Sequence, residues 1–97
     1  MKAEDLAIYV LAENKRLVTP AIVDIDSLWE FSITQWTYEE ILRRINKNPH
    51  MDLVDLLEQF INEMDDAICA LHGNEFWVDK FITARDTADW VLQQVLV

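Results

Sequence analysis

Glycine and proline are scarce in this sequence, which has one Gly and two Pro among its 97 residues. Tight turns between β-strands depend on these residue types, because Gly readily adopts positive φ and Pro fixes φ. Their scarcity argues against a sheet built from hairpins and favours long helices joined by short connections. The expected fold class is all-α, a small helical bundle that spans residues 1–97 as a single domain.

Other absences exclude whole classes of protein. Cys69 is the only cysteine, so no internal disulfide can form. The N-terminal stretch MKAEDLAIYVLAENKR carries acidic residues where a signal peptide needs an unbroken apolar run, and no apolar run approaches the roughly 20 residues that span a bilayer. Phosphate-binding loops need several glycines, which this chain lacks. These features predict a cytoplasmic protein with no membrane helix and no glycine-rich nucleotide site.

Positive charge is also scarce, because 8 Lys and Arg stand against 18 Asp and Glu, for a net charge of -10. Direct binding to nucleic acid or to an anionic membrane would need a concentrated basic patch to overcome this field. The basic residues are scattered, and only Lys15-Arg16 and the group Arg43, Arg44 and Lys47 are close in sequence. We therefore expect no direct contact with nucleic acid or membrane, and a basic protein as the partner.

Apolar residues, by contrast, are abundant. Hydrophobic residues fill 52% of positions, and the chain has 4 Trp, 2 Tyr and 4 Phe. This content rules out a disordered chain, which lacks the apolar area for a core. In so small a domain it can also exceed what one monomer buries, so a homodimer is an open alternative to a monomer.

The N-terminal half is expected to form three helices, over residues 3–14, 24–33 and 38–46, with a connector at 17–23. Asp24 or Asp26 is the expected cap of the second helix. Thr37 followed by Glu40 matches a capping box, in which each side chain bonds the other residue's backbone amide, and predicts the start of the third helix. Pro49 ends that helix, because its ring disfavours helical geometry at the residue before it.

The C-terminal half carries two heptad patterns, which predict an antiparallel hairpin of residues 52–71 and 76–96. Gly73 lies between them, where a left-handed helix cap favours glycine. The N-terminal helices are expected to close the other side of this hairpin. The positions of the first pattern are Val54, Leu57, Ile61, Met64, Ile68 and Leu71, widened by Leu53, Leu56 and Phe60. Those of the second are Trp77, Phe81, Ala84, Ala88, Val91 and Val95.

Acidic residues gather on the first helix of this hairpin. At 100° per residue they lie within about 160° on the side away from the apolar pattern. Such a face can be an ordinary solvated surface, or it can bind a basic partner. The residues are Asp52, Asp55, Glu58, Glu63, Asp65 and Asp66.

Trp90 falls more than about 100° from the centre of the second apolar pattern. Either an N-terminal helix covers it, or it contacts a partner or a second copy, since Trp is enriched at interaction hot spots. The other three tryptophans, Trp29, Trp36 and Trp77, are expected in the core.

Catalytic and metal sites have little support in this sequence. His50 and His72 are the only histidines, and a helix between them would hold them about 33 Å apart, too far to share an ion. Ser27 and Ser32 have no nearby histidine and no G-x-S-x-G elbow. Carboxylates near Cys69 disfavour its thiolate, so we interpret it as a packing residue. We expect no catalytic residue, no cofactor and no metal.

Residues 49–95 carry a resemblance. The stretches PHMDLVDLLEQFINEMDDA and FITARDTADWVLQQV resemble the small acidic proteins of phages and prophages of Gram-positive bacteria. The resemblance implies an accessory phage protein that acts in the host cytoplasm, and it supplies no catalytic residue.

The sequence therefore predicts a non-enzymatic protein-binding protein with an accessory or regulatory role, in which acidic residues steer a basic partner and an exposed Trp anchors it. The residues expected to bind this partner are Asp52, Asp55, Glu63, Asp66 and Trp90. The alternative is a nucleic-acid mimic that occupies the DNA- or RNA-binding site of a host protein. Carboxylates three residues apart on a helix advance about 4.5 Å, on the scale of the roughly 3.4 Å between phosphates of one strand.

Overall fold

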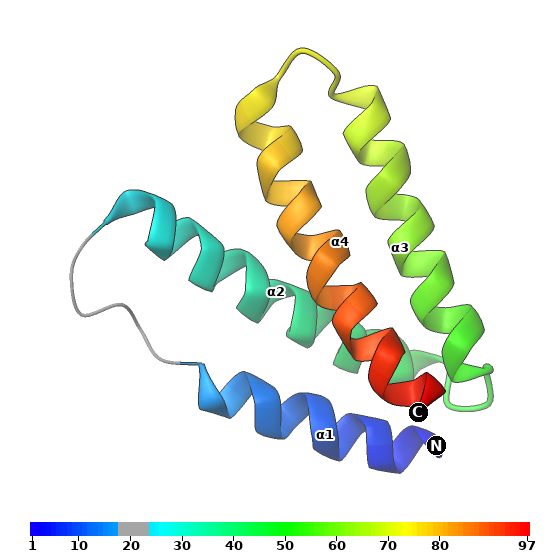
Figure 1. Ribbon diagram of the computed structural model, residues 1–97. Coiled ribbons are helices and arrows are strands. Elements are labelled where there is room, and N and C mark those ends of the chain that lie inside the picture. The colour runs from blue at the N-terminus through cyan, green and yellow to red at the C-terminus, as the bar shows by residue number, and fades with distance from the viewer. Residues whose placement is uncertain (18–23) are drawn as a thin grey trace.

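The computed structural model describes residues 1–17 and 24–97, and this part of the chain forms four α-helices and no strand (Figure 1). The predicted all-α fold is confirmed. None of the helices described is both long and apolar enough to cross a membrane. The helices are α1 (Ala3–Arg16), α2 (Ile25–Lys47), α3 (Leu53–Ala70) and α4 (Glu75–Leu96).

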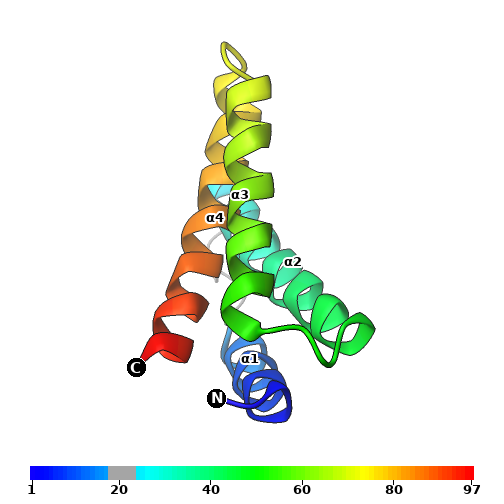
Figure 2. The same ribbon diagram turned by 90° about the vertical axis from the view of Figure 1, so that its right-hand side faces the viewer.

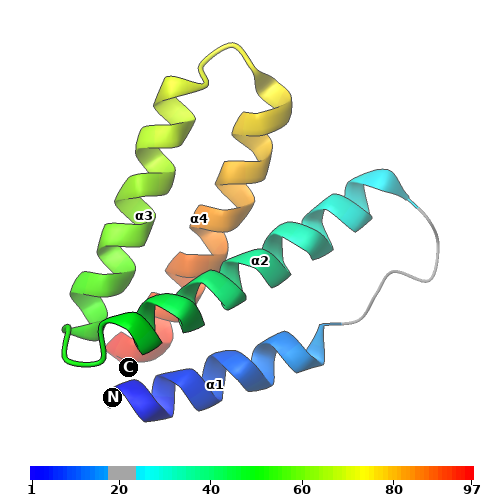
Figure 3. The ribbon, with the colours of Figure 1, turned by 180° about the vertical axis from the view of Figure 1, so that it is seen from behind.

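The helices pack in the order α1, α2, α4, α3. The most extensive contact joins α3 to α4, which run in opposite directions along their length (Figure 2). Seen from behind, α2 crosses α4, and α1 follows α2 on its other side (Figure 3). The predicted antiparallel C-terminal hairpin is therefore confirmed, and α2 is the element that connects it to the N-terminal helix.

Helix α1 forms where the apolar pattern predicts it and continues to Arg16, two residues beyond the predicted end. Leu6 and Val10, one turn apart on one face, are fully buried against the core. Leu17 leaves the helix with extended backbone angles, as expected for the start of a connector. The rest of the predicted connector, 18–23, lies outside the described residues.

Helix α2 is one helix of 23 residues, so the prediction of two short helices with a capping box at Thr37 is wrong. Thr37 is fully buried in mid-helix, and its hydroxyl donates a hydrogen bond to the carbonyl oxygen of Ile33 at 2.8 Å. A Thr side chain can make this bond without breaking the helix. Because residues 25–47 contain neither Gly nor Pro, nothing interrupts the backbone hydrogen bonds.

Helix α2 begins and ends close to the residues that the sequence predicts. Asp24 is the N-cap, and its carboxylate accepts a hydrogen bond from the backbone N–H of Asp26 at 3.2 Å. The helix ends at Lys47, and Asn48 is the C-cap immediately before Pro49.

The core of the hairpin lies on one broadened face of α3. Of the six positions of the predicted pattern, only Leu57 and Met64 are buried. The flanking residues Leu53, Leu56 and Phe60 are buried as well. The face is turned toward these flanking positions because α3 contacts α2 in addition to α4. The guanidinium of Arg44 on α2, for example, lies 4.9 Å from the centre of the Phe60 ring.

Helix α4 buries the small residues Ala84 and Ala88, together with Val91, as its pattern predicts. Small side chains let neighbouring helices approach closely. Gly73, in the turn before α4, has φ of +93°, and a Cβ there would meet nothing within 4 Å. Glycine is therefore favoured at position 73 by the positive φ of the backbone, and not by a lack of space for a side chain.

Candidate protein-binding surface

The four predicted acidic residues do not form a free acidic surface, because two of them have structural partners. Asp52 is the N-cap of α3, and its carboxylate accepts a hydrogen bond from the backbone N–H of Asp55 at 3.1 Å. Glu63 forms an ion pair with Arg44 of α2. These two carboxylates therefore help to hold α3 in place.

Two arginines interrupt the acidic face of α3. Arg44 lies against Glu63, and Arg85 of α4 lies 3.2 Å from the carboxylate of Asp65. The hydrogen bond that Arg85 donates to Asp65 is the main reason that the pKa of Arg85 is raised. Among the described residues Asp55 and Asp66 form no ion pair, and both are exposed. The surface of α3 thus has mixed charge.

Trp90 is neither fully covered by an N-terminal helix nor fully exposed for contact with a partner or a second copy. Its side chain is 55% exposed, yet its indole N–H donates a hydrogen bond to the hydroxyl of Tyr9 on α1 at 3.1 Å. Within the described parts of the chain, no hydrogen bond or ion pair joins Trp90 to the predicted acidic residues. Trp90 lines a depression with residues of α2 and α4 only, whereas the four predicted acidic residues lie at the start of α3 or along it.

A cluster of aromatic rings, Trp29, Phe76 and Trp77, connects the start of α2 to the start of α4. Trp29 lies edge-on to both other rings, with centroids 5.3 Å from Phe76 and 6.2 Å from Trp77. Phe76 and Trp77 are also edge-on to each other at 5.3 Å. Such T-shaped pairs are favourable because the positive edge of one ring faces the negative face of another. The cluster fixes the relative position of two helices at the end of the hairpin.

Lys80 is the one positive charge packed into this aromatic cluster. The residue is only 7% exposed, and its ammonium nitrogen lies 4.6 Å from the Phe76 ring centre and 5.6 Å from that of Trp29. The negative faces of the two rings partly replace the water that burial removes. The nitrogen also lies 3.4 Å from the carboxylate of Asp79. Lys80 is therefore satisfied within the chain.

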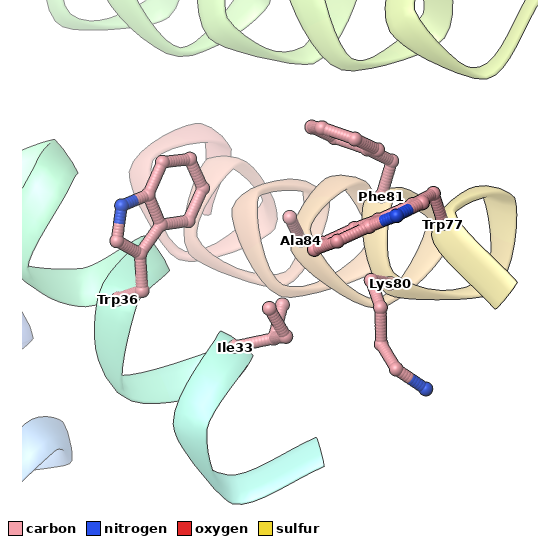
Figure 4. Close-up of a pocket in the computed structure, with 6 residues that line it drawn as sticks. All are labelled: Ile33, Trp36, Trp77, Lys80, Phe81 and Ala84. Atoms are coloured by element: carbon pink, nitrogen blue, oxygen red, sulfur yellow. The ribbon is translucent and has the colours of Figure 1, made fainter. Parts of the chain in front are cut away.

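An apolar hollow of about 190 Å³ lies beside the cluster, between α2 and α4. Its lining consists of Ile33, Trp36, Trp77, Lys80, Phe81 and Ala84. Figure 4 shows Trp36 and Trp77 on opposite sides of the hollow with Ala84 between them. The ammonium nitrogen of Lys80 points away from Trp36 (Figure 4). The hollow therefore offers apolar contacts and no free polar group.

The large side chains around this hollow are substantially exposed. Trp36 and Trp77 are each 42% exposed and Phe76 is 47% exposed, so the prediction that Trp36 and Trp77 lie in the core is wrong. Ile25, beside Trp29, is 67% exposed. We call Ile25, Trp36, Phe76 and Trp77, with the hollow, the aromatic face.

A second depression, next to Phe76, contains exposed carboxylates. Asp26, Glu75 and Asp79 line a depression that also includes Phe76, and all three side chains are exposed. The only basic residue in that depression is the buried Lys80. This depression shares only Lys80 with the hollow, and Glu75 and Asp79 lie on the opposite side of α4 from Trp77, Phe81 and Ala84.

The aromatic face depends on a helix that the sequence analysis divided in two. In one continuous helix Trp29, Ile33 and Trp36 are spaced by four and three residues, so they share a side of α2. This spacing is the signal that could have revealed the surface. The predicted break at Thr37 concealed it, because it placed Trp29 and Trp36 on opposite sides of a helix end.

No family model, curated protein or solved structure matches this chain. The chemistry of its own surfaces is therefore the basis for a functional proposal. The described residues include no group of three or more His, Cys, Asp or Glu side chains that could hold a metal ion. Cys69 is exposed, so the interpretation of this residue as a packing residue is wrong. Burial, with Glu13 and Tyr9 nearby, raises the pKa of Tyr38, which keeps this phenol protonated between α1 and α2.

Proposed function

We propose that this chain is a non-enzymatic protein-binding protein that recognises its partner through the aromatic face. The observation that carries the proposal is the pair Trp36 and Trp77, both 42% exposed, on either side of an apolar hollow. Tryptophans that flank an apolar pocket are the typical anchors of protein interfaces.

The energetics of exposure support this proposal. Small soluble proteins rarely leave several large apolar side chains together in water, because each loses the favourable free energy of burial. In this chain Trp36 and Trp77, which line the same hollow, and Phe76, which packs against Trp77, stay exposed while a full core forms elsewhere. A partner that covers the aromatic face would recover this free energy on binding.

The net charge of -10 gives the partner a preferred sign. A negative field speeds the approach of a basic protein and suppresses contact with acidic ones. Asp55 and Asp66 contribute to this field at long range, and Trp90 offers a second, separate contact. The phage resemblance, the cytoplasmic location, the accessory role and homodimer formation stay predictions.

Mimicry of nucleic acid also stays a prediction, with the overall charge as its support. The face of α3 on which it rests is interrupted by Arg44 and Arg85, which pair with Glu63 and Asp65. A surface that imitates a row of phosphates needs uninterrupted negative charge. Protein binding through the aromatic face is therefore the better supported function.

Affinity capture from a bacterial lysate, at low and at high salt, tests the proposal. The baits are the wild-type chain, the double variant Trp36→Ala/Trp77→Ala and the control Ile8→Ala, which removes a 68% exposed apolar side chain from α1. Circular dichroism confirms that each bait keeps its helices. We expect a protein that the wild type and Ile8→Ala retain and that the double variant loses. Retention of that protein by the double variant would refute the proposal.

A further inference from the structure

We infer that a second depression between α2 and α4 binds an organic cation that carries an ammonium group on an aliphatic chain. This depression, which we call the polar groove, has a volume of about 320 Å³ and includes Trp90. It shares no residue with the apolar hollow, so the inference goes beyond the proposed function and does not depend on it.

Helical spacing brings the lining of the polar groove together. From α2 the groove takes Glu30, Thr34 and Tyr38, which are four residues apart and form one row along the helix. From α4 it takes residues 83, 86, 87 and 90, whose spacing places them on one side of that helix. That side lies more than about 100° around α4 from the residues that line the hollow. The polar groove is therefore a separate site.

Two carboxylates, one on each helix, determine the charge of the ligand. Glu30 of α2 is exposed and forms no ion pair with a described residue. Asp86 of α4 accepts hydrogen bonds from Arg85 at 3.3 Å and 3.4 Å, and both end on Oδ1, which leaves Oδ2 without a partner among the described residues. In the part of the chain that the structure describes, no basic residue lines the groove. The groove therefore attracts a cation and repels an anion.

Two hydroxyls and the indole of the groove have already donated their protons. Thr83 donates to the carbonyl oxygen of Asp79 at 3.2 Å and Thr87 to that of Thr83 at 2.8 Å, so each offers a ligand only lone pairs. The indole N–H of Trp90 donates to Tyr9, so Trp90 offers its ring. Lone pairs and carboxylates bind N–H donors, and an aromatic ring attracts positive charge. An ammonium group supplies both.

The hydroxyl of Tyr38 is independent evidence for a ligand. Tyr38 is only 6% exposed and lines the groove, yet its hydroxyl forms no hydrogen bond with another described residue. A buried hydroxyl without a partner costs free energy. An ammonium group in the groove would supply the missing hydrogen bond.

The volume of the groove suits a small molecule. Sites for small-molecule ligands typically have about 300–1,000 Å³, and the groove is at the lower end of this range. An aliphatic diamine has two ammonium groups for the two carboxylates and an apolar chain for the ring of Trp90. The Lys side chain of a partner protein has the same chemistry, and the test distinguishes it from a free amine.

NMR titration of the full chain provides the test. An ionic strength of about 0.15 M screens general attraction to the net charge of -10. The indole N–H signal of Trp90, assigned by its loss in Trp90→Phe, reports on the groove. The probes are the diamine putrescine, its neutral analogue butanediol, tetramethylammonium, which is a cation without N–H donors, and Nα-acetyl-lysine amide, which carries the Lys side chain.

Four variants locate the binding. Glu30→Gln removes one carboxylate of the groove with almost no change in size, and its matched control Glu39→Gln removes the same charge from an exposed residue of α2 outside the groove. Tyr38→Phe removes only the buried hydroxyl. Trp36→Ala/Trp77→Ala alters the hollow alone. Circular dichroism confirms that each variant keeps its helices, and Glu30→Gln keeps the test valid if Tyr38→Phe unfolds, because Glu30 is exposed.

We expect putrescine to shift the Trp90 signal to saturation, and butanediol and tetramethylammonium to leave it in place. Glu30→Gln should raise the Kd about tenfold and Tyr38→Phe about threefold, while Glu39→Gln and the double Trp variant keep the wild-type Kd. Saturation by Nα-acetyl-lysine amide would support a Lys side chain as a second source of the ammonium group. Saturation by putrescine alone would support a free amine.

Three results would overturn the inference. Saturation by butanediol would make the occupant a neutral polyol. Equal losses of affinity in Glu30→Gln and Glu39→Gln would show general attraction to the net charge and no built site. A Trp90 signal that responds to neither putrescine nor Nα-acetyl-lysine amide would show that the groove binds no ammonium group.

Discussion

The carboxylate of Glu40 lies between two guanidinium groups on α2. It accepts hydrogen bonds from Nε of Arg43 at 3.0 Å and from Nε of Arg44 at 3.1 Å. The hydrogen bond from Arg43 is the main reason that the pKa of Glu40 lies below its usual 4.5, and Arg44 adds to the effect against an opposing contribution from burial. Arg44 also binds Glu63 of α3, so this charged group links two helices.

A carboxyl group whose pKa is lower in the folded chain stabilises the fold above its unfolded pKa, and this contribution disappears as the pH falls through the folded pKa. We predict that Glu40→Gln lowers the free energy of unfolding at pH 7. We expect the difference from the wild type to shrink as the pH falls below 4.5 toward the lowered pKa. Urea denaturation at a series of pH values measures this difference.

Glu39→Gln is the matched control for this experiment. It removes the same charge from the preceding residue, which is exposed and has no ion-pair partner in the described parts of the chain. We expect it to leave the stability at pH 7 close to that of the wild type. A Glu40→Gln deficit that stays constant from pH 7 to about pH 3 would contradict the proposed role of the ion pairs.

The hairpin of α3 and α4 was predictable because two independent features of the sequence agree on it. Apolar spacing of three and four residues continues for most of each helix, and a single glycine stands between them. Gly73 has the positive φ that this position requires. The glycine in the turn and the apolar faces of the two helices favour the same hairpin. A structure can be predicted from the sequence when local and long-range interactions agree in this way.

Helix α2 shows why local patterns fail when the same residues satisfy two structures. Thr37 and Glu40 have the spacing of a capping box, but the Thr37 hydroxyl bonds the carbonyl of Ile33 and Glu40 binds two arginines. The exposure of Trp36 and Trp77 was equally hidden, since it depends on how α2 crosses α4. The spacing of residues along one helix does not specify how that helix crosses another.

The continuity of α2 makes a direct prediction about Thr37. In mid-helix, Thr37→Val replaces a buried hydroxyl with a methyl group, and the Ile33 carbonyl keeps its backbone partner. We expect the free energy of unfolding to stay the same or rise. By comparison, Asp52→Ala removes the N-cap of α3 and should lower it by about 1 kcal/mol.

Urea denaturation followed by far-UV circular dichroism measures both variants. A loss of about 1 kcal/mol or more in Thr37→Val would indicate that the hydroxyl has the capping role that the sequence pattern suggested. Val is also β-branched, so the comparison is not affected by a difference in helix propensity.

The whole molecule carries a net charge of -10 on 97 residues, and its ion pairs do not offset this repulsion. Pairs such as Arg16 with Glu13 and Arg43 with Glu40 have largely exposed arginines, and exposed pairs contribute about 0–1 kcal/mol each. Repulsion among the excess carboxylates acts over the entire surface. It is also strongly reduced by salt, since the screening length falls from about 30 Å at 0.01 M to about 8 Å at 0.15 M.

We therefore predict that the midpoint of thermal unfolding rises when the ionic strength is raised from about 0.01 M to 0.15 M. Asp55→Asn/Asp66→Asn removes two exposed charges that have no ion-pair partner in the described residues. At low salt this variant should unfold at a higher temperature than the wild type and respond less to salt. Differential scanning calorimetry measures both effects, and a midpoint that falls with salt would show that attractive pairs dominate.

The exposed thiol of Cys69 has a consequence for handling and for measurement. It lies in the last turn of α3, across a short turn from Phe76 and Trp77 at the start of α4. Because the chain has no other cysteine, any disulfide that it forms is intermolecular, and a disulfide between two copies joins the tips of their hairpins. The same thiol accepts one maleimide fluorophore without any engineering, at the end of the hairpin that carries Phe76 and Trp77.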